Sequence, residues 1–106
     1  MAIGTAATHR FLAVIPDKIG VLGKRMEVRG EHKNGVKLLI ESGVISLGGP
    51  TLVSHPLVGE EPQINGSVLL LNADTQEEIL EIVRQDIYTT SGVWDLQNIR
   101  ILPLGF

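Results

Sequence analysis

Three side chains that carry or can gain a positive charge lie among apolar residues on one predicted helical face. Between residues 18 and 42, positions spaced three and four apart share one stripe; they are Arg25, Val28, Arg29, His32, Val36 and Leu39. Histidine titrates near neutral pH and arginine stays charged. The cluster predicts acid–base chemistry at His32 on an anionic or polar small molecule, with Arg25 or Arg29 stabilising a developing oxyanion. The alternative is structural: the arginine stems reach the helix edge and His32 makes one hydrogen bond.

A carboxylate is the second unusual feature. Asp86 follows Val83 by three positions and Ile79 by seven, so it falls on the inward stripe at the C-terminal end of another predicted helix. The helix dipole disfavours a negative charge there by roughly 0.3–1 kcal/mol, so a partner should compensate. Asp86 can accept a hydrogen bond from one imidazole nitrogen of His32, which fixes the tautomer and raises the basicity of the other nitrogen. Otherwise Asp86 is a solvated helix end or binds backbone N–H groups.

The sequence gives little support for a metal or a nucleotide. His9, His32 and His55 are each 23 residues apart, which matches no local zinc spacing, and we expect no metal. The glycines at 43, 48 and 49 do not form a phosphate-binding fingerprint, because no helix starts directly after them. We therefore expect no cofactor. His55 lies in a long predicted loop, where it either reaches a pocket mouth or another subunit, or is solvated.

Composition excludes several classes of protein. The 106 residues include nine Lys or Arg and 12 Asp or Glu, for a net charge of −3, so we expect no nucleic-acid binding. The chain has no cysteine, which excludes disulfides, a thiolate nucleophile and sulfur-based zinc sites, and fits a reducing compartment. No stretch approaches the roughly 18 apolar residues that span a bilayer, and the N-terminus lacks a signal-peptide pattern. We therefore expect a cytoplasmic protein with no membrane partner.

The first half of the chain predicts two strands around a helix. The apolar run 11–15 predicts a central strand, and residues 18–42 predict a helix whose glycine-rich first turn, 18–23, is irregular. Asp17 can cap this helix. Residues 44–53 predict a half-buried strand, in which a glycine pair marks a bulge or a close backbone approach. The following connection, 54–66, is longer than a usual hairpin loop, so we expect a functional or interface role for it.

The second half predicts a strand, a helix and a final strand. Residues 67–71 predict a strand that is apolar from Val68 on, and Asp74 with Glu77 matches a capping box that opens a helix over residues 75–85. The last strand, 94–102, changes the parity of its apolar positions midway. That change requires a bulge or apolar surroundings on both faces.

The predicted order is strand, helix, strand, strand, helix, strand. This is the ferredoxin-like βαββαβ arrangement, an α+β fold in which two helices cover one face of a four-stranded antiparallel sheet. The other face needs a cover, and two sheets packed face to face would supply one. A mean hydropathy of +0.21 on so short a chain also favours a covered apolar surface. We therefore expect a homodimer.

The chain resembles the YCII-like proteins of the dimeric α/β barrel superfamily from about Phe11 to Pro103. The resemblance rests on five short motifs: Arg29-x-x-His32, Gly48-Gly49-Pro50, Ala73-Asp74, Asp86-Ile87-Tyr88 and Ser91-Gly92-Val93. Ile87 replaces the proline that family members usually carry before the aromatic residue, and the loop after the second strand is longer here. The resemblance implies a homodimer with a pocket in each subunit, where His32 and Asp86 are suspected to act as an acid–base pair.

Together these features predict one YCII-like domain over residues 9–106, after a flexible N-terminal segment, 1–8. We assign the catalytic roles to His32, Asp86 and Arg29. The candidate substrate contacts are Arg25, His55, Tyr88, Ser91 and Trp94. For Trp94, plain packing in the core or at an interface is the alternative.

The functional hypothesis is a cofactor-independent lyase or isomerase of secondary metabolism. It moves a proton on, or eliminates a group from, an oxygenated substrate of phenolic or polyketide-like character. His32 is the general base, Asp86 orients it, and an arginine stabilises the oxyanion or enolate. A non-catalytic module for small-ligand binding or dimerisation is the alternative, with an acidic metabolite held in the cationic pocket. A monooxygenase-like activity on the same fold is a third hypothesis.

Overall fold

A computed structural model describes residues 9–106 of the chain. Its elements are β1 (His9–Pro16), α1 (Leu22–Glu41), β2 (Ile45–Leu52), β3 (Ile64–Ala73), α2 (Gln76–Gln85), α3 (Ile87–Thr90), the 3-10 helix η2 (Leu96–Asn98) and β4 (Arg100–Leu104). The segment 1–8, predicted to be flexible, lies outside the described residues. No helix in the described range is long and apolar enough to cross a membrane.

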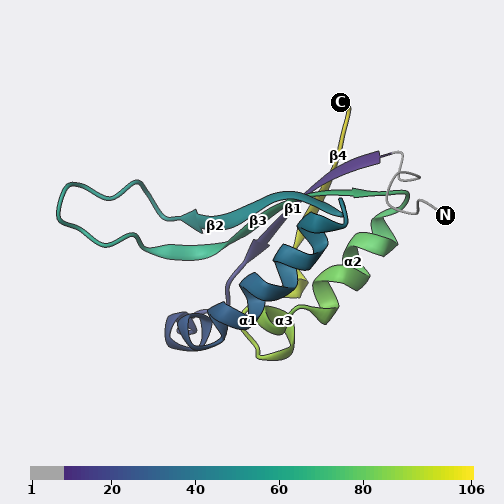
Figure 1. Cartoon of the computed structure of the whole chain (residues 1–106). Coiled ribbons are helices and arrows are strands. Elements are labelled where there is room, and N and C mark those ends of the chain that lie inside the picture. The colour runs from purple at the N-terminus through teal and green to yellow at the C-terminus, as the bar shows by residue number, and fades with distance from the viewer. Residues whose placement is uncertain (1–8) are drawn as a thin grey trace.

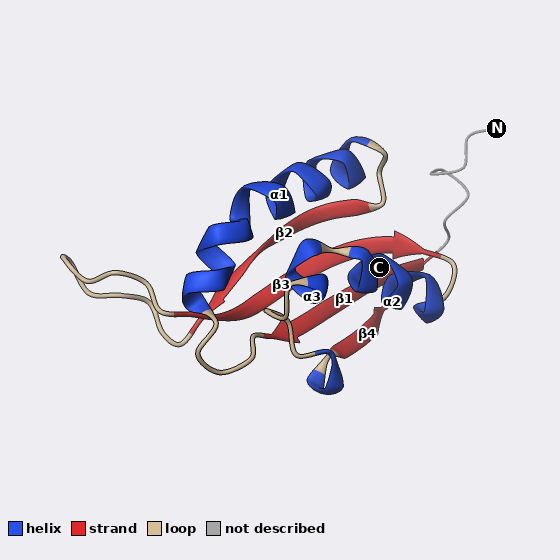
Figure 2. Cartoon of the chain, turned by 90° about the horizontal axis from the view of Figure 1, so that it is seen from below, coloured by secondary structure: helices blue, strands red, loops and turns tan. Residues whose placement is uncertain are grey.

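The four strands form one antiparallel sheet in the order β2-β3-β1-β4. β1 is central: Phe11 pairs with Leu71 of β3 on one side and with Pro103 of β4 on the other. Both long helices lie on the same face of the sheet (Figures 1 and 2). The ferredoxin-like α+β prediction is confirmed.

Alternate residues of the two central strands form the core. Phe11, Ala13 and Ile15 of β1 are buried, as are Leu69 and Leu71 of β3. Helix α2 packs Ile79 and Val83 onto this face and is amphipathic in the usual way. Helix α1 differs, because Arg25 is its only buried residue. Its apolar side chains do not seal it against the sheet.

The remaining residues of the same strands form a second apolar face, on the side away from the helices. The period of two along each strand and the register between strands assign six half-buried aliphatic residues to it: Leu12, Val14, Val68, Leu70, Leu102 and Leu104. Leu47 of β2 pairs with Leu70 and is 55% exposed. An apolar sheet face of this kind needs a cover.

Two predictions about element ends were wrong. Helix α1 begins at Leu22 rather than Lys18, because Gly20 takes a left-handed conformation (φ 76°), and the residue before the helix contributes no side-chain cap. Helix α2 is capped by Thr75, whose side chain accepts a hydrogen bond from the Glu78 N–H. The reciprocal bond, from the Asp74 N–H to the Glu78 carboxylate, moves the capping box one residue along the chain.

The strand predictions also need correction. Residues 94–102 are not one strand: η2 interrupts them and β4 begins at Arg100, so a helical turn produces the change in parity that we assigned to a bulge or to a second apolar face. β2 has two register shifts, one between Ile45 and Leu47 and one between Thr51 and Leu52, and the glycine pair between them keeps its register. β3 begins at Ile64, and the loop that joins it to β2 projects from the body as an arm (Figure 1).

Gly66 is a sheet glycine that no other residue can replace without movement of the backbone. A Cβ at Gly66 would lie 2.5 Å from the Ile15 carbonyl oxygen and 2.9 Å from Thr51 Oγ1. We expect Gly66→Ala to lower the free energy of unfolding by about 1–3 kcal/mol, as overpacking does. Gly30→Ala, on helix α1 where a Cβ meets no atom within 4 Å, should raise it by about 0.5–1 kcal/mol. Urea unfolding of both variants measures these changes. Equal changes in the free energy of unfolding would contradict the close packing around Gly66.

Candidate active site

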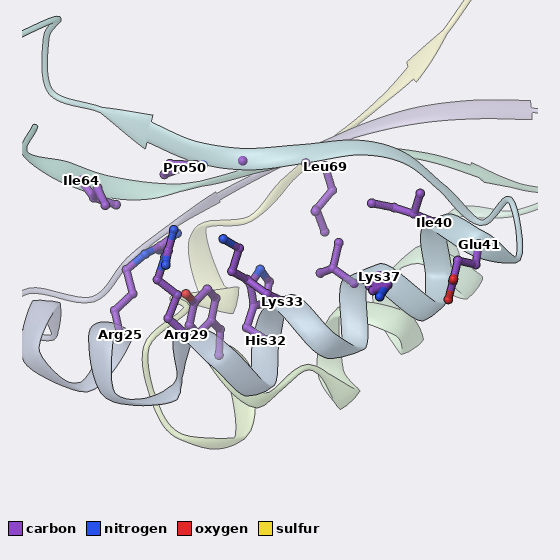
Figure 3. Close-up of a pocket in the computed structure, with 14 residues that line it drawn as sticks. Arg25, Arg29, His32, Lys33, Lys37, Ile40, Glu41, Pro50, Ile64 and Leu69 are labelled. Atoms are coloured by element: carbon purple, nitrogen blue, oxygen red, sulfur yellow. The ribbon is translucent and has the colours of Figure 1, made fainter.

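A pocket of about 480 Å³ separates helix α1 from the sheet (Figure 3). Its wall on the helix side carries the stripe that contains Arg29 and His32. The sheet contributes Gly48 and Leu69, and α3 contributes Tyr88. Of the apolar residues of α1, Val28, Val36 and Leu39 pack against the core, but none of them is fully buried.

His32 and Asp86 meet beside this pocket. His32 Nδ1 lies 2.8 Å from Asp86 Oδ1 and 2.9 Å from Oδ2, and the two side chains are only 13% and 12% exposed. A carboxylate accepts, so Nδ1 carries the proton and donates it, which leaves the lone pair of neutral imidazole on Nε2. Nε2 forms no hydrogen bond with residues 9–106. Every buried side-chain nitrogen or oxygen in this range has a hydrogen-bond partner, so an atom without a partner is not buried. Nε2 is therefore open to solvent or a ligand.

Asp86 is held in place by a break between two helices. Helix α2 ends at Gln85, and Asp86 takes an extended conformation (φ −67°, ψ 143°). Its Oδ1 also accepts a hydrogen bond of 2.8 Å from the Tyr88 N–H and so caps α3. Asp86 therefore binds both partners that the sequence suggested as alternatives, the His32 imidazole and a backbone N–H group.

Two aromatic rings fix the orientation of His32. Its imidazole stacks on the Tyr88 ring, with centroids 3.9 Å apart and planes 15° apart. The Trp94 ring meets both of them edge-on, at 5.5 Å. Burial raises the pKa of Tyr88, while the charges of Arg25 and Arg29 oppose the rise. Tyr88 therefore remains a neutral phenol near neutral pH.

Arg25, one of the residues that line the pocket, forms a buried ion pair. Its Nη1 lies 2.7 Å and 2.9 Å from the two carboxylate oxygens of Asp17, and its Nη2 donates to Ser67 Oγ at 2.9 Å. The guanidinium also lies 4.6 Å from the Tyr88 ring centroid. Burial raises the pKa of Asp17, and the Arg25 charge opposes this effect. Asp17 thus pairs with Arg25 and does not cap the helix as predicted.

The structure adds cations that sequence reasoning missed. Lys33 and Lys37 line the pocket and continue a spacing of four that starts at Arg25 and Arg29. Within residues 9–106, Arg29, Lys33 and Lys37 form no ion pair. The repeated interval was the available signal, because residues four apart share a helix face. Glu41 is the acidic residue in the lining.

Three predicted substrate contacts lie outside the pocket lining. His55 is exposed in the loop between β2 and β3. Ser91 donates from its hydroxyl to the Ile87 carbonyl oxygen at 2.6 Å, at the end of α3. Trp94 is 2% exposed and donates from Nε1 to Ser67 Oγ at 3.1 Å, behind His32 and Tyr88. Arg25 and Tyr88 do line the pocket.

In the described part of the chain, no group of three or more His, Cys, Asp or Glu side chains is placed to hold a metal ion. The groups that can do chemistry in the pocket are a general base at Nε2, a neutral phenol and unpaired cations. Together they can move a proton and stabilise negative charge on a bound oxygen atom.

A ferredoxin-like fold with a His–Asp pair at the edge of a cationic pocket defines the class of protein. The sequence pattern of the YCII-related domain matches residues 9–102, and the chain belongs to this family. One relative, fusaric acid biosynthesis protein 2 from Gibberella fujikuroi, is 38% identical over 93 residues, which cover 88% of this chain and 89% of the relative. The relatives include proteins of secondary-metabolite biosynthesis.

Two solved structures share the fold. One is 5-chloro-2-hydroxyhydroquinone dehydrochlorinase from Burkholderia phenoliruptrix AC1100 in complex with 2,5-dihydroxybenzoquinone; the TM-score is 0.70 at 24% identity, and 92% of each chain is covered. The other is a dimeric protein of unknown function and ferredoxin-like fold from Bacteroides fragilis NCTC 9343, with a TM-score of 0.50 at 12% identity, covering 92% of this chain and 95% of that one.

The two arginines should respond differently to the same substitution. Arg25→Met leaves the Asp17 carboxylate buried without its cation, so we expect the free energy of unfolding to fall by about 3–5 kcal/mol. Arg29→Met removes an exposed cation without an ion pair and should change it by less than about 0.5 kcal/mol. Urea unfolding compares them. A similar small effect for both would show that the buried pair does not hold the fold.

Proposed function

We propose that this protein is a cofactor-independent acid–base enzyme of the lyase or isomerase type, and that its substrate is a hydroxylated or quinonoid ring. One observation carries the proposal: His32 donates from Nδ1 to a nearly buried carboxylate and presents Nε2 beside a pocket lined by unpaired cations. A histidine that only filled space would not need a fixed tautomer or an accessible second nitrogen.

The proposed reaction begins with proton transfer from a ring hydroxyl to His32 Nε2. The O–H electron pair becomes a C=O bond, and the negative charge moves to another ring position. His32 returns the proton to that carbon, which completes an isomerisation. In an elimination, His32 then takes the proton of a second ring hydroxyl; the electron pair of that O–H bond forms a C=O bond, the adjacent ring double bond shifts to the carbon that carries the leaving group, and the group departs with its bonding electrons. Asp86 stabilises the imidazolium, and Arg29 with Lys33 stabilises the oxyanion. Neither route changes the total number of electrons in the substrate and its products.

The similarities support this choice of substrate class. The dehydrochlorinase that shares the fold acts, by its name, on a chlorinated hydroxyhydroquinone, and its structure contains a dihydroxybenzoquinone. Loss of hydrogen chloride is an elimination and needs a base and a stabilised ring oxyanion. The similarity of our protein to a protein of fusaric acid biosynthesis supports the proposal that its substrate is a secondary metabolite.

The first test uses halogenated hydroxyhydroquinones as substrates and follows halide release. We expect His32→Ala and Asp86→Asn each to lower kcat/KM by about 10²- to 10⁴-fold. The double variant should lose little more, because both residues act in one unit. Asn retains an oxygen acceptor for the Tyr88 N–H, so the local fold should persist. His55→Ala, in the exposed loop, is the control and should retain full activity.

Two outcomes would contradict the proposal. Activity retained in both site variants would exclude the acid–base pair. Tight binding of the ring by the wild-type protein without turnover, across chlorinated, brominated and unsubstituted rings, would instead favour the non-catalytic binding module.

We also propose that two copies pack through the apolar sheet face described above. The face carries six half-buried aliphatic residues, no helix of residues 9–106 covers it, and the Bacteroides fragilis protein with a similar fold is dimeric. The pocket lies on the opposite side of the sheet, between the sheet and α1, so pairing through this face leaves the site open (Figure 1).

Leu70→Lys tests this assembly, because Leu70 lies in a central strand of that face. We expect sedimentation equilibrium to give the mass of a dimer for the wild-type protein at micromolar concentration and a shift toward the monomer for the variant. Leu38→Lys is the matched control: Leu38 is 67% exposed on α1, and its substitution should leave the mass unchanged. A wild-type mass near one chain would exclude the dimer.

A further inference from the structure

We infer that the substrate carries an apolar arm, such as a short alkyl or alkenyl chain, on its oxygenated ring. The ring lies at His32 and the arm lies along the C-terminal half of α1. This inference rests on the proposed function for the position of the ring. It adds a second subsite, made by Ile40, Leu69 and Gly48.

The pocket is too large for a ring alone. Its volume of about 480 Å³ is roughly three times that of the ~150 Å³ cavity that holds one benzene molecule. It also extends along the helix: Arg25 and Ile40 both line it, and 15 residues of α-helix span about 22 Å. His32 lies near the middle of that length. About half of the pocket therefore lies beyond the residue that would bind the reacting ring.

The chemistry of the lining changes along that length. Around His32 the pocket is charged or polar, with Arg29 and Tyr88. Beyond it the wall includes Val36 and Ile40 of α1, and Figure 3 shows Ile40 and Leu69 projecting into the space between α1 and the sheet.

Ile40 is 45% exposed, so a ligand can still remove apolar surface from water there. The charged residues of this half, Lys37 and Glu41, are exposed, and their flexible side chains can keep the ammonium and carboxylate groups in water. A chain without charge thus fits this half better than a second polar group.

Gly48 sets the width of this subsite. A Cβ at this position would lie 2.7 Å from Cδ2 of Leu69. The Leu69 side chain therefore occupies the space that the Cβ of any other residue at position 48 would need. A larger residue at position 48 must push Leu69 away from β2. Glycine at this position therefore keeps Leu69 against the sheet and the arm subsite open.

Calorimetric titration with hydroxyhydroquinones tests the inference. The probes carry no side chain, an ethyl chain, a butyl chain or a chain that ends in a carboxylate. For the wild-type protein we expect affinity to rise by up to about fourfold for each added methylene group, up to butyl. Ile40→Ala should reduce this gain to about twofold or less per methylene while the unsubstituted ring binds as before. Leu38→Ala, an exposed aliphatic residue of the same helix outside the lining, is the control and should keep the full gain.

Gly48→Ala supplies an independent measurement. We expect it to weaken butyl binding at least tenfold relative to the unsubstituted ring, and its urea unfolding shows that the variant is folded. Wild-type affinity that does not depend on chain length, or that rises only for the carboxylate-ended chain, would overturn the arm subsite. Halide release from a chlorinated hydroxyhydroquinone without a side chain tests the acid–base function separately, so the two proposals can fail independently.

Discussion

The buried ion pair between Arg25 and Asp17 determines where helix α1 lies. Arg25 is the only residue of α1 that is buried, and its guanidinium binds the carboxylate at the end of β1 and the Ser67 hydroxyl of β3. An ion pair of this kind adds little net stability over apolar packing, but breaking it is costly, so it fixes one arrangement. Ser67 also accepts a hydrogen bond from Trp94, which extends the network to the segment after α3. The helix is therefore held by directional contacts at its N-terminal half.

This mode of attachment explains why a pocket exists. Helix α2 lies on the sheet through a continuous apolar stripe, and no cavity is needed there. Helix α1 is attached through Arg25 and, two turns later, through the contact of His32 with Asp86. Neither contact draws the C-terminal half of α1 onto β3. The space that remains is bounded by the same side chains that hold the helix, so the residues needed for the fold and those proposed for chemistry are neighbours in one network.

The sequence predicted the fold well where apolar periodicity decides it. β1 and α2 were found within two residues at each end, because β1 is a continuous apolar run and α2 starts at a capping signal. Residues 94–102 were misread, since η2 and a strand give mixed apolar positions that periodicity cannot separate. In the site, Arg29, His32, Asp86 and Tyr88 were identified from unusual positions and a family resemblance. The pairing of Arg25 with Asp17 was not, because it joins residues across the turn before α1, whose path depends on tertiary contacts.

Helix α1 also violates the local rules that stabilise helices. Cations recur every four residues from Arg25 to Lys37, and like charges at this spacing destabilise a helix by about 0.2–0.5 kcal/mol per pair. Its interior contains Gly30 and Gly35, each of which costs about 0.5–1 kcal/mol relative to alanine. Only the Arg25 charge is balanced by an ion pair, so Arg29, Lys33 and Lys37 contribute no salt bridge among the described residues that offsets these costs. A ligand oxyanion at His32 would balance the charges nearest to it, Arg29 and Lys33, and for that reason this part of the stripe is better explained by binding than by folding.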